Sequence, residues 1–156
     1  MPRKIDALLS EYGESHQNPT NKAIHWICVP AIVWSIVAVL WSLPVPAPIS
    51  QLSGVNWMTV VVLLVLVYYM ILSPTLAIGF LALSFVCVAL IMAYEALFSF
   101  PIWQFALILF VVAWIGQFVG HKIEGKKPSF FKDVQFLLIG PAWLMHFLYK
   151  KMRIPY

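Results

Sequence analysis

The residues of this chain best suited to metal chemistry are its four histidines, His16, His25, His121 and His146. Two polar residues accompany His121: Gln117 lies four positions before it and Glu124 three positions after it. On a helix these three side chains share one face. The segment before them is apolar. Because a polar stripe on a membrane helix costs free energy, it usually marks a functional site.

A second polar stripe leads to His25. Asn18 and Asn21 precede His25 with the spacing i, i+3, i+7, so the three side chains also share a helical face. The two stripes would face each other if their helices pack together. Gly116 and Gly120 are small residues four positions apart, which permits two membrane helices to approach closely at this point.

Histidines at such a point could hold a divalent transition metal, because imidazole suits iron, zinc and copper. His16 precedes the second stripe on a turn that can fold back over the same point. Glu124 could bind the metal or orient a histidine through its other ring nitrogen. The candidate metal ligands are His16, His25, His121 and His146, and the candidate catalytic residues are Glu124, Gln117 and Asn21. The alternative is that the histidines only anchor the chain at a membrane interface.

The elements that must position these residues are membrane helices. Of 156 residues, 62% are hydrophobic and only 10% are charged, which is not the composition of an ordinary soluble domain. About 20 apolar residues suffice to cross a bilayer. We predict an all-α, polytopic membrane protein that forms a single integral membrane domain over residues 1–156. Its four transmembrane helices are expected at residues 23–43, 57–72, 76–97 and 102–120.

Two further segments are helical but too short to span. Apolar residues near the start recur with helical spacing, which predicts an N-terminal amphipathic helix lying on the membrane surface; they are Ile5, Leu8, Leu9 and Tyr12. Residues 136–149 form an apolar run of only 14 residues, with Gly140 and Pro141 inside it. We expect this segment to be interfacial or re-entrant and to be broken at the glycine and proline.

The distribution of basic residues gives the orientation. Basic side chains precede the first predicted span and follow the fourth; they are Arg3, Lys4, Lys22, Lys122, Lys126, Lys127 and Lys132. The loops after the first and third spans contain no lysine or arginine. By the positive-inside rule both termini are cytoplasmic. The four histidines then lie at the cytoplasmic face of a multi-pass protein of a bacterial inner membrane or the endoplasmic reticulum.

Other chemistries have little support. No serine lies in a nucleophile-elbow pattern and no glycine-rich phosphate loop is present, and no nucleic-acid partner is expected. Two alternatives to redox metal chemistry stay open. One is a zinc-dependent hydrolase of membrane lipids, and the other is a non-catalytic membrane transporter or scaffold.

Three segments carry a family resemblance: YGESHQNPTNKAIHWICVP at residues 12–30, WIGQFVGHKIEGKKPSF at residues 114–130 and QFLLIGPAWL at residues 135–144. With the apolar middle, they make the chain similar to the 2-hydroxy fatty acid dioxygenase family over nearly its whole length. The resemblance implies an Fe(II)-dependent enzyme of fatty-acid α-oxidation, with dioxygen as cosubstrate and no 2-oxoglutarate.

Such an enzyme shortens a 2-hydroxy long-chain fatty acid by one carbon. By resemblance, the essential histidines of the family correspond to His16, His25 and His121, and Glu124 belongs to the same motif. The substrate would come from the membrane lipid, with its tail among the spans and its carboxylate at the interface. Lys122, Lys126 or Lys127 could pair with that carboxylate, although a role as orientation charges is the other reading.

Overall fold

The computed structural model describes residues 3–50, 55–128 and 135–156, and within these ranges the chain is helical and contains no strand. This confirms the predicted all-α class. The helices are α1 (Lys4–Glu14), α2 (Pro19–Ser42), α3 (Ala47–Ser50), α4 (Trp57–Leu72), α5 (Pro74–Leu97), α6 (Ile102–Glu124) and α7 (Phe136–Met152).

Three of these helices are long and apolar enough to cross a membrane: α2, α5 and α6 have 24, 24 and 23 residues. Their outward faces carry exposed apolar side chains, among them Phe85 and Ile108, as contact with lipid requires. The helix α4 has only 16 residues. At 1.5 Å per residue it is about 24 Å long, against a hydrocarbon core of about 30 Å. The number of four spans therefore stays a prediction.

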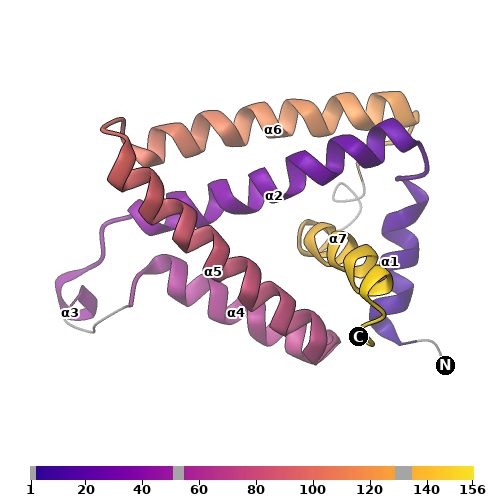
Figure 1. Ribbon diagram of the computed structural model, residues 1–156, viewed down its shortest axis with the longest axis horizontal. Helices are drawn as coiled ribbons and strands as arrows, with labels where there is room; N and C mark the ends of the chain where they lie inside the picture. The colour runs from indigo at the N-terminus through magenta and orange to yellow at the C-terminus, as the bar shows by residue number, and fades with distance from the viewer. Residues whose placement is uncertain (1–2, 51–54, 129–134) are drawn as a thin grey trace.

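The two helices that carry the polar stripes pack along their length as an antiparallel pair (Figure 1). Glycines on α6 make this contact close. A Cβ atom on Gly116 would lie 2.6 Å from Sγ of Cys28, and one on Gly120 would lie 2.4 Å from Oδ1 of Asn21. The predicted role of the two glycines in close helix packing is confirmed.

A second antiparallel pair is formed by α4 and α5, which Ser73 joins. The hydroxyl of Ser73 caps α5 by accepting a hydrogen bond from the Leu76 amide, and Pro74 occupies the first turn. The two pairs meet near the start of α6 and diverge toward the opposite end of the molecule, where α1 and α7 fill the opening between them (Figure 1). The candidate site lies at this open end.

The N-terminal helix is amphipathic, as predicted. It buries Ile5, Leu9 and Tyr12, and it packs against α7. Burial of these apolar side chains stabilises the contact by roughly 25 cal/mol per Å² of surface removed from water. The end of α1 is thereby held beside the start of α2.

The helix α7 differs from the sequence prediction, because it continues through Gly140 and Pro141 without a break. Proline in a helix interior removes one backbone hydrogen bond and displaces the carbonyls of the preceding turn. Here the hydroxyl of Tyr69, on α4, donates to the carbonyl of Leu138 in that turn. Gly140 and Pro141 are themselves buried. Tertiary packing therefore offsets the local cost of the proline.

Candidate metal centre

Three of the four histidines meet at the open end of the helix pairs. His16 comes from the turn between α1 and α2, His25 from α2 and His121 from α6, and their exposed fractions are 1%, 1% and 5%. One candidate ligand nitrogen of each ring lies within 4.8 Å of those of the other two. The structure thus brings together residues that are up to 105 positions apart in the sequence.

Hydrogen bonds determine which ring nitrogens of two of these histidines are free. Nδ1 of His16 lies 2.6 Å from the carbonyl oxygen of Tyr12, and Nδ1 of His25 lies 2.9 Å from the carbonyl oxygen of Asn21. A carbonyl oxygen only accepts, so each Nδ1 carries the hydrogen. In the neutral ring the other nitrogen, Nε2, then presents a lone pair.

The two Nε2 atoms of His16 and His25 face each other at 2.9 Å. Burial lowers the pKa of His16 from 6.5 to about 4, so this ring is neutral at physiological pH. Two lone pairs at this distance repel each other unless a cation lies beside both of them. The third ring also has a free nitrogen, because Nδ1 of His121 is buried and has no hydrogen-bond partner among the described residues.

The arrangement fits a divalent transition metal. Two nitrogen ligands about 2.05 Å from one ion would be about 2.9 Å apart at a right angle and about 3.3 Å apart at the tetrahedral angle of zinc sites. The 2.9 Å between the two Nε2 atoms is closer to the first of these values. Three imidazoles leave further coordination positions for other ligands. His16, His25 and His121 could therefore hold iron or zinc.

Glu124 lies beside this group but is occupied by other partners. Its carboxylate accepts hydrogen bonds from the backbone amides of Gln17 and Asn18, both at 2.8 Å, and from the side-chain amide of Asn21 at 3.1 Å. A carboxylate at the start of a helix also interacts favourably with the helix dipole. In this structure, Glu124 therefore attaches the end of α6 to the turn that carries His16 and to the start of α2.

Asn21 contributes to the same attachment. It is fully buried, and its side-chain amide donates to the carbonyl of Ser15 at 3.1 Å as well as to Glu124. Its own carbonyl holds the ring of His25. The side chain of Asn18 caps α2 by accepting from the amides of Thr20 and Asn21, which completes the turn.

The structure does not bring His146 to the other three histidines. It lies on α7, where its Nδ1 is hydrogen-bonded to the hydroxyl of Tyr156. Lys122, Lys126 and Lys127 do not line the cavity that begins at the histidines. Lys126 donates to the carbonyl of Glu14, and the described cavity lining beside the histidines includes no lysine.

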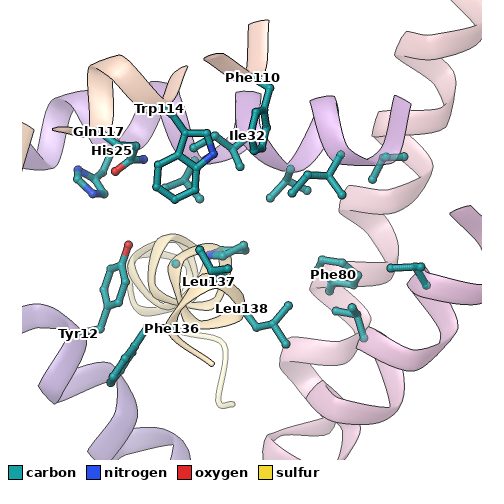
Figure 2. A pocket seen from close by; sticks show the side chains of 18 of the residues that line it. Tyr12, His25, Ile32, Phe80, Phe110, Trp114, Gln117, Phe136, Leu137 and Leu138 are labelled. Carbon is teal, nitrogen blue, oxygen red and sulfur yellow. The ribbon is translucent and has the colours of Figure 1, made fainter. Parts of the chain in front are cut away.

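An apolar cavity of about 320 Å³ begins at the histidines (Figure 2). His25, His121, Gln117 and Tyr12 line one end of it. Residues of α2, α4, α5, α6 and α7 line the rest, including Ile32, Val62, Phe80, Phe110 and Leu138. On α2 the lining runs from His25 to Leu40. These 15 residue steps correspond to about 22 Å of helix.

The aromatic support of the site was not part of the sequence prediction. The ring of Tyr12 stacks on that of His16, with centroids 4.1 Å apart and planes 11° from parallel, and Trp143 contacts both rings. Tyr12 lies four positions before His16, a spacing that places side chains together on a helix. That spacing was available from the sequence, but Tyr12 was assigned to the apolar face of α1.

The fold and the site define a class: a helical protein with membrane-type helices and three buried histidines at the end of an apolar cavity. The chain belongs to the Mpo1-like family, because the family model described as "2-hydroxy-palmitic acid dioxygenase Mpo1-like" matches residues 3–152. Over 148 residues it is 32% identical to the 2-hydroxy-palmitic acid dioxygenase MPO1 of Saccharomyces cerevisiae. The aligned region covers 91% of this chain and 78% of the yeast protein. No solved structure matches the chain. The predicted family is confirmed.

Proposed function

We propose that this protein is an Fe(II)-dependent dioxygenase of fatty-acid α-oxidation, which converts a 2-hydroxy long-chain fatty acid to the acid one carbon shorter. The observation that carries the proposal is the convergence of three buried imidazoles with free ring nitrogens, two of which, His25 and His121, line the end of an apolar cavity. The yeast relative, named a 2-hydroxy-palmitic acid dioxygenase, supports the same reaction.

Iron held by His16, His25 and His121 would supply the one-electron and dioxygen chemistry that amino-acid side chains cannot provide. Backbone carbonyls of the chain orient two of the ligand histidines. The carbonyls of Tyr12 and Asn21 keep the hydrogen of each ring on Nδ1, so that Nε2 of His16 and His25 is available. Neutral, oriented imidazoles lose little free energy on binding a cation, because no proton has to be displaced.

The apolar cavity would bind the acyl chain of the substrate. Each buried methylene contributes about 0.8 kcal/mol, so an apolar wall favours long chains. The wall along α2, about 22 Å, exceeds the roughly 15 Å of one half of the bilayer hydrocarbon core. A long-chain acid can therefore place its head at the histidines and its tail along α2, with water excluded from both.

In this proposal residues 1–156 form one multi-pass membrane domain that takes its substrate from the surrounding lipid. Four spans would put both termini and the histidines at the cytoplasmic face. This placement rests on the basic residues at both ends of the chain.

The test is metal analysis combined with turnover. Purified protein should contain iron and convert 2-hydroxypalmitate to pentadecanoate only with dioxygen present. Alanine at His16, His25 or His121 should remove iron and reduce turnover at least about a hundredfold, since loss of a ligand costs more than loss of a supporting group. His146→Ala is the matched control and should keep both. Full turnover after chelation and in the His121→Ala variant would show the proposal to be wrong.

A zinc-dependent lipid hydrolase is the second candidate, because three histidines with an open position are also a known ligand set of catalytic zinc. Zinc without iron, together with activity on a lipid ester in the absence of dioxygen, would favour it. Metal-free protein whose properties do not change when the three histidines are replaced would instead point to a non-catalytic transporter or scaffold.

A further inference from the structure

Two polar side chains at the histidine end of the cavity have no partner. Tyr12 and Gln117 are only 7% and 5% exposed, and both line the cavity. Within the described residues, neither the phenol hydroxyl nor the side-chain amide makes a hydrogen bond. Because both side chains line the cavity, their hydrogen-bonding groups are available to a ligand that occupies it.

The two side chains approach this end from different elements. Tyr12 comes from α1 and Gln117 from α6, and Figure 2 shows them on opposite sides of the cavity, with the Tyr12 hydroxyl pointing toward Gln117 and His25. Gly140 makes room for the hydroxyl, because a Cβ atom there would lie 3.1 Å from it. The Tyr12 ring is held by the ring of His16, which stacks on it, and by the tilted ring of Trp143. The phenol is therefore positioned before a ligand arrives.

The lining also limits what this ligand can be. A carboxylate in an apolar cavity needs hydrogen-bond donors, because burying an unpaired charge costs far more than burying a paired one. The described lining contains neither lysine nor arginine. The hydroxyl of Tyr69, which also lines the cavity, is already used by the Leu138 carbonyl. Tyr12 can donate one hydrogen bond and Gln117 two.

We propose that the Tyr12 hydroxyl and the Gln117 amide bind the carboxylate of the fatty acid, so that neutral donors recognise the head group. This inference rests on the proposed function for its substrate. The phenol hydroxyl of a tyrosine is protonated at neutral pH and can donate a hydrogen bond. A carboxylate offers about four acceptor positions, enough for both donors. Acids should therefore bind more tightly than alcohols of equal length.

The experiment measures binding separately from turnover. Radiolabelled palmitate and 1-hexadecanol are bound to the detergent-solubilised protein; neither carries the 2-hydroxyl of the substrate. Tyr12→Phe keeps the ring and the carbonyl that holds His16, and Gln117→Leu keeps a side chain of similar size. Each variant should weaken palmitate binding roughly ten- to a hundredfold, as expected for a lost hydrogen bond to a charged group. Hexadecanol binding should not change.

The matched control is Tyr149→Phe, whose hydroxyl donates to the carbonyl of Thr75 away from the cavity lining. It should keep the preference for palmitate. Equal weakening of acid and alcohol in Tyr12→Phe and Gln117→Leu, or unchanged palmitate binding in both, would overturn the inference.

The same preparations separate this inference from the proposed function. If the wild type contains iron and turns over substrate while both variants keep the palmitate preference, the proposed function is supported and the carboxylate site is contradicted. If the protein has neither iron nor turnover but Tyr12→Phe and Gln117→Leu selectively lose palmitate binding, the carboxylate site is supported and the proposed function is contradicted. In active protein, the variants should raise KM for 2-hydroxypalmitate more than they lower kcat.

Discussion

At the scale of single residues, the two best-defined ligands are prepared by their own local sequence. In both His16 and His25 the ring hydrogen is held by the carbonyl four positions earlier, that of Tyr12 and that of Asn21. This is the separation that brings groups together on one turn of helix. Nδ1 of His121 has no such bond among the residues that the structure describes, and the packing of α6 determines where this ring lies.

The structure offers a specific role for Glu124. Three donors surround its carboxylate, and two of them are amides of the turn that follows His16. A carboxylate so engaged acts as an attachment between α6 and this turn. We therefore propose that Glu124 positions His16 and does not bind the metal.

Replacement of Glu124 by glutamine tests this role. An amide cannot accept as strongly and brings its own donors toward the backbone amides, so Glu124→Gln should destabilise the protein by about 1.5–3 kcal/mol. Iron affinity should fall roughly ten- to a hundredfold, the range for loss of a supporting group. The measurements are thermal unfolding in detergent and iron content as a function of added iron.

The control for this variant is Glu95→Gln, since Glu95 is exposed near the end of α5. It should change neither quantity. If iron is absent from Glu124→Gln at every iron concentration while the fold is intact, Glu124 is a ligand and the positioning role is wrong.

At the scale of elements, the site depends on how closely α2 and α6 pack. Oδ1 of Asn21 is buried, has no hydrogen-bond partner in the described part of the chain, and lies against Gly120. There is no space for a methyl group between them, since a Cβ on Gly120 would be 2.4 Å from that oxygen. The next residue on α6 is His121, so any displacement here moves a candidate ligand.

We expect Gly120→Ala to push α6 away from α2 and to separate His121 from His25. Overpacking of this kind costs about 1–3 kcal/mol. The melting temperature should fall and iron content should fall with it, which metal analysis and thermal unfolding can measure together.

Gly125→Ala provides the comparison on the same helix. Gly125 ends α6 with a φ of 73°, but no atom of the described residues lies within 4 Å of a Cβ placed there. Alanine should cost about 1–2 kcal/mol of backbone strain and leave the iron in place. Wild-type iron content in Gly120→Ala would contradict the view that helix packing positions His121.

At the scale of the whole molecule, the divergence of the two helix pairs creates both the cavity and the site. The pair α2 and α6 provides His25 and His121, and α1 and α7 close the open end (Figure 1). Both termini lie at this end, where the guanidinium of Arg3 bonds to the backbone of Tyr156 and stacks over its ring at 5.6 Å. An even number of spans would place them on one side of a membrane.

Cysteine labelling tests that number. In a variant with Cys28 and Cys87 replaced by alanine, Ser10→Cys and Ser99→Cys introduce thiols at exposed positions before α2 and between α5 and α6. Four spans predict that a membrane-impermeant maleimide labels the two positions from opposite sides of the membrane. If α4 does not cross, Ser99→Cys should be labelled from the same side as Ser10→Cys, and the four-span topology is wrong.

Much of the site could be predicted from the sequence, because helical periodicity determines which residues share a face. The spacing of Gln117, His121 and Glu124, and that of Asn21 and His25, predicted two faces that the structure places together. The close approach of the helices followed from Gly116 and Gly120. These features are local, so the intervening chain does not affect them.

Tertiary structure decided the rest. In the folded chain, His146 is hydrogen-bonded to Tyr156, and the carboxylate of Glu124 accepts from backbone amides. Tyr12 lines the cavity. Tertiary packing also lets α7 continue through Gly140 and Pro141. The physical reason is common to these cases. Periodicity defines the face of one helix, whereas the partner of that face depends on how elements far apart in the chain pack around each other.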